Sequence, residues 1–312
     1  MLQEVQSSKT APRADVQDIP SLLIAVGEQP EHLFGVQFIS QFFKDFDRMH
    51  FRLMHLLPPS HGVVPGPYGL PVEAGRMDEA IYTRHREMGR HSLQLASGML
   101  RQAGIPEGNI SLISRPQNQT KALDLIQESA ANNHHALVLG NRGRSWFEAM
   151  LDGIPDITRE VIDASCGIPL WIAPSIVEKR RDILLCVDGS RYAMNMVRHV
   201  GETLGSQGTQ NVTLLRVLRD RNNNPTPPEV IFEECRNELE ERGVPSDSIR
   251  VRVVTDNDPA AGILSVCERG KFAVVAMGRA GYGNSFMRRL LMGSVSRDVM
   301  RQLNNACLWL TC

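Results

Sequence analysis

The sequence predicts an α/β protein made of two tandem domains, each a doubly wound sheet of five parallel strands. Three observations lead to this prediction. The chain has 312 residues, which is enough for two cores of ordinary size. Short apolar runs alternate with stretches of helical periodicity, and the second half repeats the pattern of the first.

The repeat is clearest near the end of each half. The sequence HALVLGNRG at 135–143 is matched by FAVVAMGRAG at 272–281, and EVIDASCGIPLWIAP at 160–174 is matched by DVMRQLNNACLWLTC at 298–312. Working back from these anchors, three earlier apolar runs align in order. They are 21–26 with 182–187, 51–57 with 212–218, and 109–114 with 249–255. Each half therefore reads as five strands with about four helices between them.

The helical stretches between these runs decide the type of sheet. Strands rich in Val, Ile and Leu that alternate with helices form parallel sheets covered on both faces. Right-handed crossovers make such a sheet doubly wound, and its ligand crevice lies beyond the carboxyl ends of the strands, where the strand order reverses. We therefore expect the crevice of each domain directly after its first and fourth strands.

The domain boundaries follow from the same pattern. We expect a polar leader at 1–19, a first domain at 20–175 and a second domain at 181–312, joined by the short polar linker SIVEKRRD at 175–182. The Pro- and Gly-rich segment 58–75 could be a binding loop or a mobile insertion, and its composition favours the insertion.

Composition and charge exclude several classes of partner. The formal net charge is -1, so no basic field attracts nucleic acid. The longest apolar runs are far shorter than the roughly 20 residues of a membrane span. The N-terminal stretch has no apolar signal core, so a soluble cytoplasmic protein is expected.

The cysteines and histidines show no metal-binding spacing. There is no C-x-x-C pair, and the cysteines are expected to be reduced, mostly buried thiols. Eight of the nine histidines precede residue 136, and none forms an i, i+4 helical pair, so we assign them no chemistry. The six cysteines are Cys166, Cys186, Cys235, Cys267, Cys307 and Cys312.

The second half carries a candidate phosphate cradle. Asp188 ends the first strand, and MGRAGYGNSFMRRLLMGSVSRDV follows the fourth. Glycines let backbone N–H groups approach an anion, and a helix that begins with Gly-Ser adds its amino end and a hydroxyl. The candidate residues are Asp188, Gly189, Ser190, Gly278, Gly281, Gly283, Gly293 and Ser294.

This conjunction resembles the universal stress protein pattern, G-x-x-G, nine residues, then G-[S/T], and the resemblance covers nearly the whole chain twice. It implies an adenine nucleotide alpha-hydrolase-like fold and, in the nucleotide-binding branch, ATP with a divalent ion such as Mg²⁺. By position, Asp188 and Val217 would hold the adenine and Gly278 would lie near the ribose. Gly293 and Ser294 would bind phosphate oxygens.

One departure from the pattern leaves the phosphate donor open. Eleven residues separate Gly281 from Gly293, whereas nine separate Gly283 from Gly293. Arginine side chains could supplement the cradle, although exposed arginines are more often simply solvated. These arginines are Arg279, Arg288 and Arg289.

The first half keeps the pattern of the fold but loses that of the site. Gly27 stands where Asp188 stands, and Glu28 and Gln29 replace the Gly-Ser that follows it. Carboxylates near a triphosphate repel it unless a cation intervenes. A degenerate partner domain is predicted, the alternative being a site for a less anionic ligand. The corresponding loop contains Gly140, Gly143, Glu148, Asp152, Gly153, Ile154 and Pro155.

Two functional hypotheses remain open from the sequence. One is a nucleotide-binding stress or signalling module, and the other is a structural interaction protein with empty crevices. No nucleophile and base stand at a recognisable spacing, so no catalytic residue is predicted, and slow ATP hydrolysis is the most that we expect. The short last strands, 169–173 and 307–311, are expected to pair across an intramolecular pseudo-twofold axis, as last strands of the family commonly do across a dimer. Association of two chains stays open.

Overall fold

A computed structural model gives the arrangement of most of the chain. It describes residues 20–43, 49–59, 62–65, 71–74, 79–140, 157–164, 167–175, 180–205, 209–219, 226–280 and 292–311.

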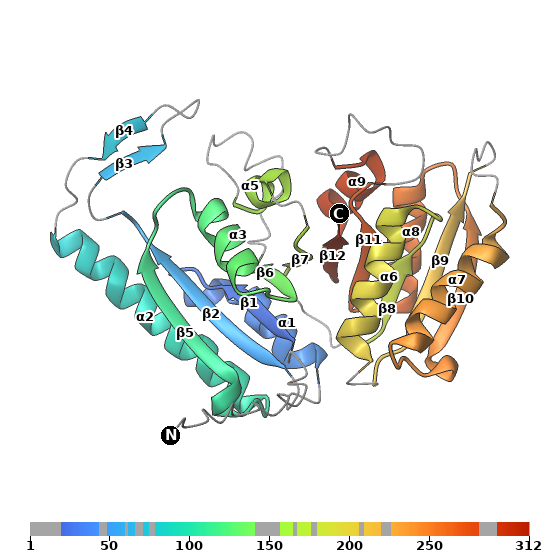
Figure 1. Ribbon diagram of the computed structural model, residues 1–312, viewed down its shortest axis with the longest axis horizontal. Coiled ribbons are helices and arrows are strands. Elements are labelled where there is room, and N and C mark those ends of the chain that lie inside the picture. Colours follow the sequence, from blue (N-terminus) through green and yellow to red (C-terminus); the bar gives the residue numbers. More distant parts are fainter. Residues whose placement is uncertain are drawn as a thin grey trace, which may run out of the picture.

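One ten-stranded sheet runs through both halves, in the order β10-β9-β8-β11-β12-β7-β6-β1-β2-β5. Figure 1 shows the two halves side by side along this sheet, the first coloured blue to green and the second yellow to red. The first half supplies β1 (Ser21–Ala25), β2 (His50–Leu57), β5 (Ile110–Pro116), β6 (Ala136–Gly140) and β7 (Leu170–Ala173). The second half supplies β8 (Ile183–Cys186), β9 (Val212–Leu218), β10 (Ile249–Thr255), β11 (Val274–Gly278) and β12 (Cys307–Thr311).

The strands within each half are parallel, and their order reverses at one place. In the first half the reversal lies between β1 and β6, and in the second it lies between β8 and β11. These are the first and fourth strands of each half, so the strand order reverses where the repeat predicted it, and the ligand crevices are expected at these strand ends. The predicted fold class is confirmed.

Helices cover both faces of the sheet and bury two apolar layers. One layer lies beneath α1 (Phe34–Phe42), α2 (Glu79–Gln102), α6 (Arg191–Leu204) and α7 (Pro228–Glu241). The other lies beneath α3 (Lys121–Ala131), α5 (Ile157–Ala164), α8 (Pro259–Gly270) and α9 (Ser294–Gln302). Strands such as β1 and β8 are buried on both faces, which explains their unbroken runs of Leu and Ile. Short 3₁₀ turns lie at η1 (Pro30–His32), η3 (Glu107–Asn109) and η4 (Ser246–Ser248).

The two halves join through their last strands. β7 and β12 pair antiparallel, with Trp309 opposite Trp171 and Leu308 opposite Ile172. All the other pairings of the ten-stranded sheet are parallel. This antiparallel pair is the contact expected from the two short apolar strands, because each would otherwise be an uncovered sheet edge.

The segment 58–75, expected to be a mobile insertion, includes regular structure. It contains the antiparallel hairpin of β3 (Gly62–Pro65) and β4 (Pro71–Ala74), which stands apart from the main sheet in Figure 1. The helix that follows, α2, has 24 residues, whereas its counterpart α7 has 14. Of the helices that the structure describes, none is both long and apolar enough to cross a membrane.

Candidate functional site

The crevice of the second half begins directly after β8. The Asp188 side chain accepts a hydrogen bond from the Ser190 backbone N–H, with Oδ1 and N 2.9 Å apart. Gly189 between them has φ +77°, a conformation that side chains other than that of glycine rarely adopt. The Ser190 hydroxyl in turn accepts from the Ala193 N–H at 3.1 Å and caps α6. The direction of the Asp188 carboxylate is therefore fixed by the turn that starts α6.

A buried arginine lies beside this turn. Arg216 of β9 is 4% exposed, and its Nη1 donates to the Val187 carbonyl oxygen at 3.4 Å. Burial lowers the pKa of Arg216, and the nearby Asp188 carboxylate raises it in part. Asp188 thus faces a buried positive charge. The sequence analysis missed Arg216, whose only signal was a single charged residue in the apolar run VTLLRVL.

Val217 lies next to Asp188 across the sheet. β8 and β9 pair Cys186 with Leu215, and the same register extended by two residues places Asp188 beside Val217. Val217 is half-buried and packs on the α8 side of the sheet. The two residues that the resemblance assigned to adenine therefore lie near the carboxyl ends of adjacent strands, Asp188 two residues beyond β8 and Val217 within β9.

Gly278 at the end of β11 has a clear packing role. A Cβ placed there would lie 2.7 Å from the Tyr192 carbonyl carbon and 2.9 Å from the Ala193 nitrogen. Only glycine lets the first turn of α6 approach the strand this closely. Thr311 ties β12 to the same turn, since its hydroxyl donates to the Tyr192 carbonyl oxygen at 3.3 Å.

The amino end of α9 is hydrogen-bonded to Arg279, the residue that follows β11. The Arg279 carbonyl oxygen accepts from the Gly293 N–H at 2.9 Å and from the Ser296 hydroxyl at 2.7 Å. Ser294, the first residue of α9, is exposed, and Gly293 supplies no side-chain cap. The first turn of α9 contains no acidic residue. This helix end therefore presents backbone N–H groups and a hydroxyl near the crevice.

Not all of the predicted cradle can be placed. Gly281, Gly283, Arg288 and Arg289 lie outside the described residues, so the phosphate donor within the loop stays a prediction. Arg279 differs from the solvated side chain that was expected, because it is only 4% exposed.

At the corresponding strand end of the first half, Glu28 is hydrogen-bonded to α2. The Glu28 carboxylate lies 2.9 Å from His85 Nδ1, and the Ser92 hydroxyl donates to the Glu28 carbonyl oxygen at 2.9 Å. Both partners belong to the long helix α2. His55 occupies the position that matches Arg216, and its Nδ1–H donates to the Val26 carbonyl oxygen at 2.9 Å. The residues Gly143, Glu148, Asp152, Gly153, Ile154 and Pro155 lie outside the part of the chain that the structure describes.

Comparisons with known proteins agree with this architecture. Residues 179–308 match the sequence profile of the Universal stress protein family. A universal stress protein from Archaeoglobus fulgidus DSM 4304 is similar in structure over 93% of this chain and 95% of its own, with TM-score 0.63 and 17% identity. A functionally unknown protein from Pseudomonas aeruginosa PAO1 is similar over 95% of this chain and 93% of its own, with TM-score 0.50 and 12% identity.

Shorter structures match less well. A universal stress protein in complex with cAMP is similar over 42% of this chain and 96% of its own, with TM-score 0.33 and 16% identity. No curated protein matches the sequence of this chain. The two long structural matches show that one fold type runs through both halves.

Proposed function

Because residues 179–308 match the universal stress protein family, we propose that this chain is a tandem stress-response or signalling module that binds ATP or a related adenine nucleotide in its second half. The two units of the proposal are residues 20–175 and 181–312. The first unit is a partner domain without a nucleotide site.

The observation that supports the proposal is that two kinds of polar group follow the two strands that flank the reversal of strand order. The Asp188 carboxylate, held by Ser190 N–H, is an acceptor suited to the adenine amino group. The open amino end of α9, fastened to Arg279, is suited to phosphate oxygens. They follow β8 and β11, the two strands that flank the reversal of strand order, where α/β sheets bind ligands.

A divalent cation would enter this site with the nucleotide. Mg²⁺ is usually bound through substrate phosphates and only one or two protein oxygens. The Ser294 hydroxyl is the exposed protein oxygen at the end of the crevice assigned to phosphate. Its expected role is to bind a phosphate oxygen or the cation that accompanies it.

The geometry of the first half supports an asymmetric module. Glu28 stands beside the position that corresponds to Asp188 and already binds His85 of α2. A nucleotide would have to displace this pair and would meet a negative charge at the strand end. One nucleotide per chain is therefore expected.

The test starts with the protein as purified. The full chain is denatured, the released small molecules are identified by mass spectrometry, and the refolded chain is titrated calorimetrically with ATP and Mg²⁺. One adenine nucleotide per chain, bound more weakly by the Ser294→Ala variant, is the expected result. Two equivalent nucleotides would contradict the asymmetry. No nucleotide under any condition would favour the structural interaction module instead.

A further inference from the structure

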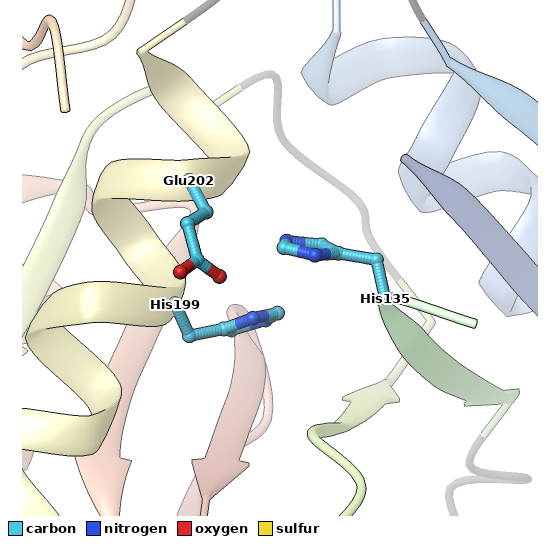
Figure 2. A group of neighbouring side chains, drawn as sticks. All are labelled: His135, His199 and Glu202. Atoms are coloured by element: carbon cyan, nitrogen blue, oxygen red, sulfur yellow. The ribbon is translucent and has the colours of Figure 1, made fainter. Parts of the chain in front are cut away.

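Two histidines meet where the halves of the chain join. His135 precedes β6 of the first half, and His199 belongs to α6 of the second. Their ring centroids lie 4.5 Å apart with the planes tilted by 30°, so the two rings are in contact. Figure 2 shows the two rings one above the other, with the Glu202 carboxylate beside them. No spacing in the sequence could have revealed this pair, because its members come from different domains.

Both histidine rings take part in hydrogen bonds between the two halves of the chain. The Trp171 indole N–H donates to His199 Nε2 at 2.9 Å. The Thr203 hydroxyl donates to the His199 carbonyl oxygen at 2.7 Å, and its oxygen lies 2.9 Å from His135 Nε2. The Trp171–His199 and His135–Thr203 hydrogen bonds each link the two halves, whereas the Thr203–His199 bond lies within α6.

These partners determine where each ring carries its proton. An indole N–H can only donate, so His199 Nε2 must accept, and the proton of the neutral ring lies on Nδ1. The single Thr203 hydroxyl hydrogen is used by the His199 carbonyl, so the Thr203 oxygen accepts from His135 Nε2–H. The proton of His135 therefore lies on Nε2. His199 fits this network only in its neutral form, whereas His135 can donate from Nε2 in either form.

A metal ion does not fit this arrangement, although ligand atoms of His135, His199 and Glu202 lie within 4.8 Å of one another. A metal would need a deprotonated nitrogen from each ring, directed at one point about 2 Å away. The Trp171 N–H already binds His199 Nε2, so that nitrogen is not available to a metal. Coordination through His199 Nδ1 would also move its proton to Nε2, where it would face the Trp171 N–H.

We propose that this pair is a proton-sensitive contact, in which protonation of His199 and His135 breaks the Trp171 hydrogen bond and weakens the joint between β7 and β12. A proton added to His199 can bind only at Nε2, which turns the acceptor into a second donor facing Trp171. A proton added to His135 binds at Nδ1 and leaves two cationic rings in contact with each other.

Burial of the two histidines determines the pH range in which protonation weakens the contact. Burial lowers the pKa of His135 to about 4, and burial followed by the charge of His135 lowers the pKa of His199 well below its usual value. We call the state in which the joint between β7 and β12 has separated the opened form. Both histidine rings are exposed to solvent in the opened form, so their pKa values there return to about 6.5. The opened form consequently binds more protons, and the closed joint loses stability as the pH falls from about 6.5 towards 4. Each histidine raises the opening constant up to about tenfold per pH unit in this range.

The charged groups around the pair do not cancel the effect. Glu202 is the acidic neighbour on α6, and its side chain is 52% exposed and lies 3.6 Å from Arg242. The pKa of His135 is lowered by burial, and that of His199 is lowered by burial and then by His135. β7 and β12 bring the uncharged rings of Trp171 and Trp309 against His199, and Phe38 of α1 packs edge-on against Trp171.

The test compares the full-length chain with the double variant His135→Gln, His199→Gln. Glutamine keeps an oxygen that can accept from Trp171 and an N–H that can donate to Thr203, but it cannot be protonated in this range. Exciton-coupled circular dichroism of the stacked Trp171 and Trp309 rings reports closure of the joint. It is recorded from pH 7.5 to 4.5 in the presence of a chelator, with His91→Gln on the exposed face of α2 as the matched control.

The natural chain and the control should lose the exciton signal as the pH falls below about 6, and the double variant should keep it. The two single variants, each with one histidine left, should lose it at intermediate pH, and they provide the comparison if the double variant does not fold at pH 7.5. Identical titration of all variants would overturn the proposal. So would thermal stabilisation of the natural chain by added zinc that the double variant lacks, since it would assign the pair to a metal.

Discussion

Trp171 of β7 and Trp309 of β12 stack with their ring centroids 4.0 Å apart and their planes 4° apart. Both side chains are fully buried, and they lie opposite each other in the antiparallel register. Phe42 packs edge-on against Trp309, and Phe43 stacks on Trp171. The joint between the halves is therefore part of one continuous apolar core and not a loose contact between two finished domains.

The first prediction concerns this joint. Replacement Trp309→Ala should lower the free energy of unfolding by about 3 to 5 kcal/mol, because it removes a large buried ring and leaves a cavity beside Trp171. Urea unfolding of the full chain measures the change. Leu112→Ala is the control, since Leu112 on the outer strand β5 is 47% exposed and should matter far less. Equal effects of the two substitutions would show that the halves do not depend on their joint.

The second prediction concerns the nucleotide. Replacement Asp188→Ala should weaken ATP binding about tenfold or more, because a hydrogen bond of this kind contributes roughly 1 to 3 kcal/mol. Gly27→Ala, at the matching position of the first half, should leave the affinity nearly unchanged, since no carboxylate is lost there. Calorimetric titration of both variants measures the difference. Equal loss of affinity in the two variants would argue against a site confined to the second half.

The third prediction concerns the close approach of α6 to β11. Replacement Gly278→Ala should destabilise the chain by about 1 to 3 kcal/mol, because the added Cβ would lie within 2.7 Å of the Tyr192 carbonyl carbon. Gly98→Ala on α2 is the matched control. Nothing lies within 4 Å of a Cβ at that position, so the substitution should stabilise the helix by about 0.5 to 1 kcal/mol. Thermal or urea unfolding measures both, and a neutral Gly278→Ala would contradict the packing argument.

The fourth prediction concerns thiol reactivity. Burial raises the pKa of Cys235 and of Cys267 to about 12, and it raises the pKa of Cys186 and Cys307 as well. At pH 8 only about one Cys235 thiol in ten thousand is then ionised, and the thiolate is the reactive form. Iodoacetamide should leave these four cysteines unlabelled in the native chain and label them after denaturation. Mass spectrometry of the peptides measures this, and rapid native labelling of any of the four would contradict it.

The sequence by itself determined the fold class and the place where the strand order reverses. The apolar runs around β1, β8 and β11 are buried on both faces, so their composition had to be apolar throughout, and helices had to separate them. The repeat then fixed the strand order, since right-handed crossovers leave few ways to connect such elements. Asp188 and Gly278 could be placed at strand ends on these grounds alone.

Only the tertiary structure decided which side chains meet across those elements. Arg216 reads as one charged residue in an apolar strand, and the register of β8 and β9 places it beside Val187, close enough for the Asp188 carboxylate to raise its pKa. The contact between Glu28 and His85 depends on the extra length of α2. His135 and His199 meet because β7 and β12 bring the two halves together. The periodicity of the sequence indicates which face of a helix or strand is buried. Contacts between elements that are distant in the sequence depend on how those elements pack, and the packing depends on the sequence of the whole chain.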